Sequence, residues 1–393
     1  MPSAIQSADA SPQSSFGPTA PWLAAGFLLT GLGTVLLGPL LPFLAHDWHL
    51  TDAQSGLLLL AKFIGAFIGG VTVPRRLRLG VFSGTALAGL GFAAFALAHS
   101  LLFGCATLFV SGLGLGQIIA STNILAGRRY QHHTGSALSS LNFFWSLGAV
   151  LTGLLVAAFL PHYGLRNPLL WFAALFLLTG LGGVLRPVAS RPVASTEASS
   201  PSDDSPHPLA TKIIVLFAFL LFFYGGLETC LTAWITTFTL RFSDLRLLGG
   251  QSGVVLLWAA LAAGRALSSL ILRFTGERLV QRAGLVLSVI FIAVLSVAHH
   301  GPLLSLCCVL LGLSLAPFFP TTFALLMHRR PSARVGGFIL AVSGLGAALF
   351  PWLMGVISTH TGSLRIAMAV PCALALILLL LTLIPTETSA LQP

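Results

Sequence analysis

Long apolar runs separated by short polar turns form the dominant pattern along this chain of 393 residues. A helix needs about 20 consecutive, mostly apolar residues to cross the hydrocarbon core of a bilayer. Runs of that length recur along the whole chain, and turns with Gly, Pro or charged residues separate them. The pattern predicts twelve transmembrane helices, at about 21–45, 53–74, 79–99, 101–126, 136–160, 167–186, 211–240, 251–273, 279–299, 302–327, 335–358 and 365–385.

One long polar stretch interrupts this pattern in the middle of the chain. Residues 187–209 are rich in Ser and Pro and divide the predicted helices six plus six. We therefore expect an N-terminal six-helix half at 20–186 and a C-terminal six-helix half at 210–386, joined by a cytoplasmic linker at 187–209. Residues 1–19 are rich in Ser, Pro and Ala and lack Lys and Arg, which predicts a disordered tail rather than a cleaved signal peptide. Residues 387–393 form a short C-terminal tail.

The two predicted halves contain related sequences. Segments 112–129 and 312–329 agree at six positions with a constant spacing of 200 residues, from Gly112 and Gly312 to Arg129 and Arg329. A membrane-spanning unit that occurs twice is typical of transporters whose substrate site lies between the repeats. The repeat predicts an all-α integral membrane fold with two pseudo-symmetric six-helix halves.

Basic residues mark one side of the predicted bundle. Fourteen of the 20 Lys and Arg residues lie in the turns after predicted helices 2, 4, 6, 8 and 10, and four lie in turns on the opposite side. Cytoplasmic loops carry an excess of Lys and Arg, so we expect both termini in the cytoplasm and the protein in the plasma (inner) membrane. This distribution also accounts for the net charge of +10 without a nucleic-acid partner.

Composition supports the membrane interpretation and excludes several classes of protein. Hydrophobic residues make up 56% of the chain, charged residues 8%, and the mean hydropathy is +0.94, which no soluble domain of this size requires. The five cysteines lie scattered in apolar segments, without metal-ligand or disulfide spacing, so we expect no metal and no cofactor. No nucleotide-binding loop or catalytic Ser/His/Asp constellation stands out, so we expect neither an ATPase nor an enzyme. A monomer in the lipid bilayer is the simplest assembly.

A turn after the second predicted helix resembles the signature of a known family. That signature has a Gly, then an Asp, then basic residues around a second Gly, and here the stretch runs Gly70-Val71-Thr72-Val73-Pro74-Arg75-Arg76-Leu77-Arg78. With twelve spans as six plus six, the chain resembles the major facilitator superfamily. The resemblance implies that Arg75 and Arg76 make charge-pair or gating contacts. Pro74 replaces the Asp that latches a neighbouring helix in the family, so the resemblance does not extend to that latch.

Within that family, several short phrases resemble the fucose/glucose permease-type branch. They are Gly114-Leu115-Gly116 with Asn123, Leu141-Asn142, Gly225-Gly226-Leu227-Glu228 with Trp234, and Gly362-Ser363-Leu364-Arg365. Proton symporters of that branch are expected to carry acids in spans 1 and 4. Here span 1 has no acid before Asp47, and span 4 has Gln117 and no acid.

Charged residues inside the predicted helices are the main functional candidates, because a charge in hydrocarbon is costly. Glu228 lies about 24 Å along its helix from Lys212 and about 20 Å from Arg241, near the middle of the bilayer. It is the only carboxylate at that depth in the sequence. We predict that Glu228 binds and releases the coupling proton. The alternative is a structural ion pair with Arg265 on the next helix, and the two roles are compatible.

Lys62 and Arg265 are the other two embedded charges. Lys62 is too deep to reach the membrane surface easily, so it balances Glu228, binds an anionic substrate or loses its proton. Arg265 lies about 12 Å from Arg273, and it either pairs with Glu228 or reaches the cytoplasmic surface.

Neutral polar and aromatic side chains complete the predicted substrate site. Amides and hydroxyls hold solute hydroxyls, and aromatic faces stack on sugar rings, although any one Phe is more commonly a core or lipid contact. The predicted substrate-binding residues besides Lys62 are Gln117, Asn142, Trp145, Tyr224, Trp234 and Phe319.

These observations favour a secondary active transporter that works by alternating access. We expect proton-coupled symport of a small polar solute, a sugar or a sugar acid. The sugar acid is a subsidiary expectation, because two embedded cations stand against one embedded anion. The alternatives are a uniporter, or an exporter or flippase of amphipathic compounds such as drugs or lysolipids, which the aromatic richness and the sparse polar residues support.

Overall fold

The computed structural model describes residues 20–74, 76–129, 134–185, 210–243, 247–272, 274–327, 329 and 333–384. Within these ranges all regular structure is helical. The predicted linker at 187–209 and the predicted tails at 1–19 and 387–393 lie outside the described residues. The domain boundaries therefore stay a prediction.

The first six predicted membrane segments each correspond to one helix or to a broken pair. They are α1 (Ala20–Val35) with α2 (Leu37–Asp47), α3 (Asp52–Val71), α4 (Leu77–Phe95), α5 (Leu101–Arg129), α6 (Thr134–Tyr163) and α7 (Arg166–Leu185).

The last six segments follow the same scheme. They are α8 (Thr211–Phe242), α9 (Ser252–Ile271), α10 (Glu277–Val297), α11 (Gly301–Leu315) with α12 (Phe318–Met327), α13 (Ala333–Thr361), and α14 (Leu364–Ala367) with α15 (Ala369–Leu383). A short 3-10 turn, η2 (Leu247–Gly250), precedes α9. By length and composition, ten segments of the described chain qualify as membrane-crossing, and Ser252–Ser268 in α9 is a shorter apolar helix.

Prolines explain the two long segments that break in the middle. Proline has no backbone N–H, so the carbonyl four residues earlier loses its helical donor. Pro39 withdraws the donor from Val35, where α1 ends, and Pro320 withdraws it from Ala316, just after α11 ends.

Glycines allow α3 and α5 to approach until their backbones touch. A Cβ atom on Gly65 would overlap the carbonyl of Phe109, and one on Gly112 would overlap the carbonyl of Lys62. Small residues at a four-residue spacing give such close contacts between membrane helices. The spacing of Gly65 and Gly69 therefore fixes α3 against α5, which places Lys62 next to this contact.

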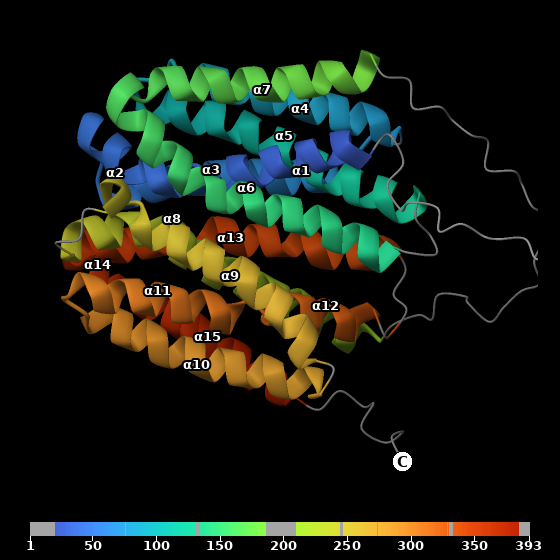
Figure 1. The fold of residues 1–393 in the computed structure, drawn as a ribbon, viewed down its shortest axis with the longest axis vertical. Coiled ribbons are helices and arrows are strands. Elements are labelled where there is room, and N and C mark those ends of the chain that lie inside the picture. Colours follow the sequence, from blue (N-terminus) through green and yellow to red (C-terminus); the bar gives the residue numbers. More distant parts are fainter. Residues whose placement is uncertain are drawn as a thin grey trace, which may run out of the picture.

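The helices form two groups that meet along one plane. In Figure 1 the helices from α1 to α7, coloured blue to green, lie above those from α8 to α15, coloured yellow to red. The contacts between the groups run mainly through α2 with α8, α3 with α13, and α6 with α9. The first residue of α1 and the last of α15 lie at the same end of the bundle, which we call the terminal end (Figure 1).

Candidate functional site

A cavity of about 590 Å³ lies between the two groups of helices. Residues of α1, α2, α3, α5 and α6 line it from one group, and residues of α8, α9 and α13 line it from the other. The lining extends from Gly38 and Thr232 to Val73, just past the end of α3, and to Phe338, near the start of α13. The cavity therefore reaches from the interior toward the terminal end.

Polar contacts join the two groups at the opposite end of the bundle. The Arg241 guanidinium, at the end of α8, donates from Nη1 to Asp52 Oδ2 at 2.7 Å and from Nη2 to Oδ1 at 2.5 Å. Ser358 Oγ on α13 donates to the same carboxylate at 2.5 Å, and the Ala53 N–H donates to Thr359 Oγ1 at 2.8 Å. These contacts tie α3 to α8 and α13, so this end of the bundle is closed beyond the cavity.

Glu228 lies on the cavity wall and has a cationic partner behind it. Arg265 Nη2 donates to Glu228 Oε1 at 3.3 Å, and the Tyr224 hydroxyl donates to the same oxygen at 3.4 Å. Arg265 Nη1 also donates to Ser146 Oγ at 2.9 Å. Because Ser146 belongs to α6, this network connects the two groups of helices. The ion pair considered from the sequence is present, with Glu228 on the wall of the cavity and Arg265 behind it.

Lys62 also lies on the wall, and it differs from Glu228 in its partner. The residue is 1% exposed, and its ammonium donates to the backbone carbonyl of Thr34 at 2.6 Å. It lies 5.3 Å from the ring centroid of Phe63. No acidic side chain in the described ranges forms an ion pair with it. A carbonyl dipole compensates only part of a buried positive charge.

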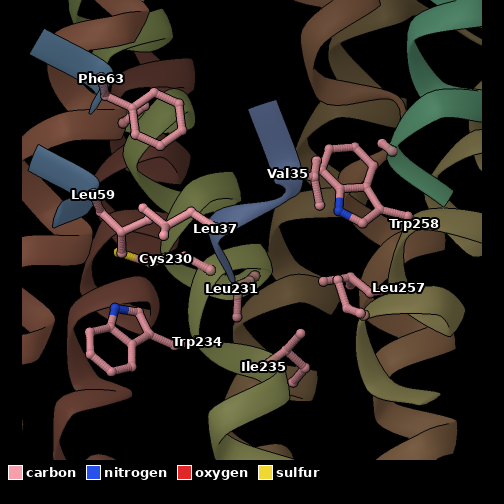
Figure 2. Packing of buried hydrophobic residues seen from close by; sticks show 14 of the residues in the cluster. Val35, Leu37, Leu59, Phe63, Cys230, Leu231, Trp234, Ile235, Leu257 and Trp258 are labelled. Atoms are coloured by element: carbon pink, nitrogen blue, oxygen red, sulfur yellow. The ribbon is translucent and has the colours of Figure 1, made fainter. Parts of the chain in front are cut away.

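Two tryptophans from different groups of helices meet at the wall. The rings of Trp145 on α6 and Trp258 on α9 lie edge to face, with centroids 5.3 Å apart and planes at 69°. Trp145 is one of the residues predicted from the sequence. Sequence reasoning missed Trp258, because a single Trp inside an apolar run gives no signal that separates a cavity wall from a core. Figure 2 shows the Trp258 indole beside Val35, where α1 gives way to α2.

The remaining predicted substrate ligands lie off the cavity lining. Trp234 Nε1 donates to the Pro351 carbonyl at 3.0 Å, and Gln117 Oε1 accepts a hydrogen bond from Ser83 at 3.1 Å. Tyr224 lies behind Glu228, with Phe319 6.2 Å from it by ring centroids. Asn142 is exposed on α6. Their roles as substrate ligands stay predictions, because none of these side chains lines the cavity in this conformation.

The two arginines predicted to act in gating differ in what the structure describes. Arg75 lies outside the described residues. Arg76 is exposed and directly precedes α4, and its side chain makes no capping hydrogen bond to that helix. Their gating role stays a prediction.

Known proteins that match the sequence are transporters. The chain is 32% identical over 180 residues to the niacin transporter NiaP of Acinetobacter baylyi, a match that covers 44% of this chain and 39% of the relative. It is 28% identical over 149 residues to a gallate transporter of Pseudomonas putida, covering 36% of this chain and 33% of the relative. These alignments span about two fifths or less of each relative's length.

Solved structures share the fold over nearly the whole chain. A bacterial homologue of the human lysosomal transporter Spinster, in an inward-facing conformation, superposes with a TM-score of 0.73 at 14% identity, covering 93% of this chain and 97% of that one. FucP in the outward conformation gives a TM-score of 0.63 at 17% identity, covering 93% and 98%. At such identities the likeness shows the fold alone.

The family model that matches the sequence is the Major Facilitator Superfamily, and it covers residues 23–339. That range includes most of both groups of helices and most of the cavity wall. Matched over most of its length and folded like solved members of that group, the chain belongs to the Major Facilitator Superfamily, and it is a multi-pass membrane transporter and not an enzyme.

Proposed function

We propose that this protein is a secondary active transporter that couples proton movement through Glu228 to the transport of a small organic anion. The observation that carries the proposal is the Glu228–Arg265 pair, in which Glu228 lies on the wall of a cavity between the two groups of helices. A sugar acid, as expected from the sequence, is one such anion. Transport of a neutral sugar, the other solute expected from the sequence, stays a prediction, and the same experiment tests it.

The asymmetry of the two ends supports alternating access. The cavity extends toward the terminal end, and the Asp52, Arg241 and Ser358 contacts hold the other end closed. A solute leaves by the other end only after these contacts part. We expect the terminal end to be cytoplasmic, so this conformation faces inward.

The pair on the wall has the properties of a coupling device. An ionised Glu228 attracts Arg265, whereas a protonated Glu228 releases most of that attraction. Arg265 also bonds Ser146 in the other group of helices, so a proton on Glu228 changes a contact that joins the groups. Protonation and the relative movement of the groups are linked in this way.

The charge of the wall favours an anion. Lys62 supplies a buried ammonium without an acidic partner in the described residues, while Arg265 and Glu228 neutralise each other. The relatives named for niacin and gallate support a small organic solute. Apolar side chains predominate on the wall, and this favours a second candidate, an exporter or flippase of amphipathic compounds.

Counterflow and gradient-driven uptake in proteoliposomes test the proposal. The substrate panel contains labelled sugars, sugar acids, benzoate, lysolipids and dyes, with and without an imposed pH gradient. Glu228→Gln keeps the shape of the side chain and removes its charge. We expect it to abolish gradient-driven anion uptake while counterflow survives. Asp47→Asn is the matched control, because Asp47 is an exposed carboxylate whose side chain pairs with the neighbouring His46.

Two outcomes contradict the proposal. Uptake of only lysolipids or dyes indicates the exporter or flippase. Full gradient-driven uptake by Glu228→Gln indicates a uniporter, or coupling through another group, and reduces Glu228 to a structural partner of Arg265.

A further inference from the structure

A cluster of exposed aromatic side chains lies on the turn between α6 and α7, at the end of the bundle that Asp52 and Arg241 close. Tyr163, the last residue of α6, lies 4.9 Å from Trp171 of α7 by ring centroids, and Phe159 lies 6.1 and 5.9 Å from these two rings. All three side chains are between 37% and 49% exposed. Trp and Tyr rings gather where a membrane helix meets water, so the cluster marks the edge of the bilayer on this side. Figure 1 shows α7 along the outer edge of the bundle.

An exposed apolar strip continues from this cluster toward the middle of the bilayer. On α6 the strip contains Leu155, four residues before Phe159, and on α7 it contains Leu175 and Leu178, four and seven residues after Trp171. Residues three and four apart lie on one face of a helix, so each helix presents these side chains together. An acyl chain of a lipid fits along such a strip, although the strip alone selects no head group.

Arg166 adds a positive charge at the membrane-surface end of the strip, as the first residue of α7. Its side chain is exposed and makes no hydrogen bond or ion pair with any residue that the structure describes. Asp47 lines a pocket of about 330 Å³ together with Gly164 and Leu165, but its carboxylate pairs with His46. The charge of Arg166 is therefore not compensated within the described part of the chain.

The two halves of the chain share the turn that precedes this arginine. His162-Tyr163-Gly164 corresponds to His360-Thr361-Gly362, and both glycines have a positive φ, of 65° and 67°. Arg166 lies two residues after the first Gly, and Arg365 lies three residues after the second. The two arginines therefore occupy corresponding places at the start of the sixth membrane segment of each half.

The protein supplies partners to Arg365 but not to Arg166. The Arg365 guanidinium donates to the backbone carbonyls of Ser296 and Ala298, at the end of α10, at 2.9 and 2.7 Å. It also lies 4.4 Å from the ring centroid of Phe242. No such contact holds Arg166 within the described residues, so its guanidinium is free to bind a group at the membrane surface.

A phospholipid has the same order of polarity as this surface. The surface has a cation at the level of the head groups, aromatic rings at the boundary and an apolar strip below them. A guanidinium binds phosphate through a planar pair of hydrogen bonds, and anionic head groups attract arginines near the membrane surface.

We propose that an anionic phospholipid of the leaflet at this end binds on the α6–α7 turn, with its phosphate on Arg166 and an acyl chain along the strip. The site is separate from the cavity, and the inference does not depend on the proposed function.

Photo-cross-linking to the purified full-length protein in detergent tests this inference. The probe is phosphatidylglycerol with a photoactivatable group on its head, and mass spectrometry locates the cross-links. We expect cross-links within residues 159–171. Unlabelled phosphatidylglycerol should reduce them roughly fivefold more effectively than phosphatidylcholine with the same acyl chains, because only the first carries a net negative charge.

Two variants test whether Arg166 supplies this preference. Arg166→Gln should remove the difference between the two lipids. Arg76→Gln is the matched control and should keep it, because Arg76 is also an exposed arginine at the start of a helix but lies at the terminal end. Both substitutions exchange an exposed side chain, so we expect the Tm of the wild type for both in detergent without lipid.

Four results overturn the inference. They are an absence of cross-links within residues 159–171, equal competition by the two lipids on the wild type, and a lipid preference that Arg166→Gln retains. The fourth is competition by inorganic phosphate as strong as that by phosphatidylglycerol, which would indicate a site for free phosphate that does not use the strip. The competition on the wild type decides the matter even if Arg166→Gln fails to fold.

Discussion

The embedded charges of this protein are compensated unequally, and that inequality is the main chemical feature at the scale of single residues. Glu228 and Arg265 compensate each other, and Arg241 and Asp52 form a second pair. The Lys62 ammonium donates to a backbone carbonyl, and no acid in the described residues forms an ion pair with it. A buried cation left in that state is costly. Under the proposed function, a solute carboxylate supplies the missing charge.

Replacing Lys62 by Gln should therefore weaken anion binding while leaving the fold intact. Hydrogen bonds to charged groups are worth about 1.5–3 kcal/mol, so we expect a roughly ten- to hundredfold rise in the KM for anion uptake. Uptake kinetics in proteoliposomes measure it. Thr34→Val is the control, because it removes a wall side chain but keeps the carbonyl that Lys62 uses. An unchanged KM in Lys62→Gln would exclude Lys62 as the anion site.

At the scale of the element, two features of the helices place these residues. The proline-dependent break between α1 and α2 brings the end of α1, with Thr34 and Val35, onto the cavity wall. The glycine contact between α3 and α5 then holds Lys62 close to the Thr34 carbonyl. The apolar composition of each segment makes it a membrane helix, whereas glycines at particular positions allow the helices to contact each other closely.

Gly65→Leu should destabilise the protein, because a side chain there overlaps the Phe109 carbonyl of α5. Overpacking typically costs about 1–3 kcal/mol, and a rigid backbone neighbour favours the upper part of that range. Thermal unfolding in detergent should show a lower Tm. Gly182→Ala on α7, where a Cβ meets nothing within 4 Å, should leave the Tm unchanged or slightly raised. Equal melting of Gly65→Leu and wild type would show that this contact is not tight.

At the scale of the whole molecule, one cluster closes the end opposite the terminal end. Asp52 accepts three side-chain hydrogen bonds, two from Arg241 and one from Ser358, and so joins α3 to both α8 and α13. The family signature has an Asp in the turn after the second span, where this chain has Pro74. The Arg241–Asp52 ion pair, which joins the two groups, is at the closed end.

Asp52→Asn should shift the protein toward opening at that end. The substitution removes the charge and turns one acceptor into an amide donor that faces the Arg241 guanidinium, with an expected loss of about 1–3 kcal/mol. Spin labels at the exposed His99 and His300 positions report the distance between the groups. We expect longer distances in Asp52→Asn and no change in Asp47→Asn. Identical distance distributions in both variants would show that the cluster does not hold the closed state.

The sequence by itself determined the membrane-spanning helices and the identity of the embedded charges. Helical hydrogen bonds and bilayer crossing depend on composition within about 20 neighbouring residues, so a local pattern suffices for them. Only the tertiary structure decided that the Lys62 ammonium donates to the Thr34 carbonyl. Every residue has a backbone carbonyl, so no sequence pattern marks the one that is used. It also decided that Trp258 lies on the wall while Trp234 is paired in the core, and that Asp52 meets Arg241 across 189 residues. Those partners depend on which helix faces meet, and long-range packing sets this.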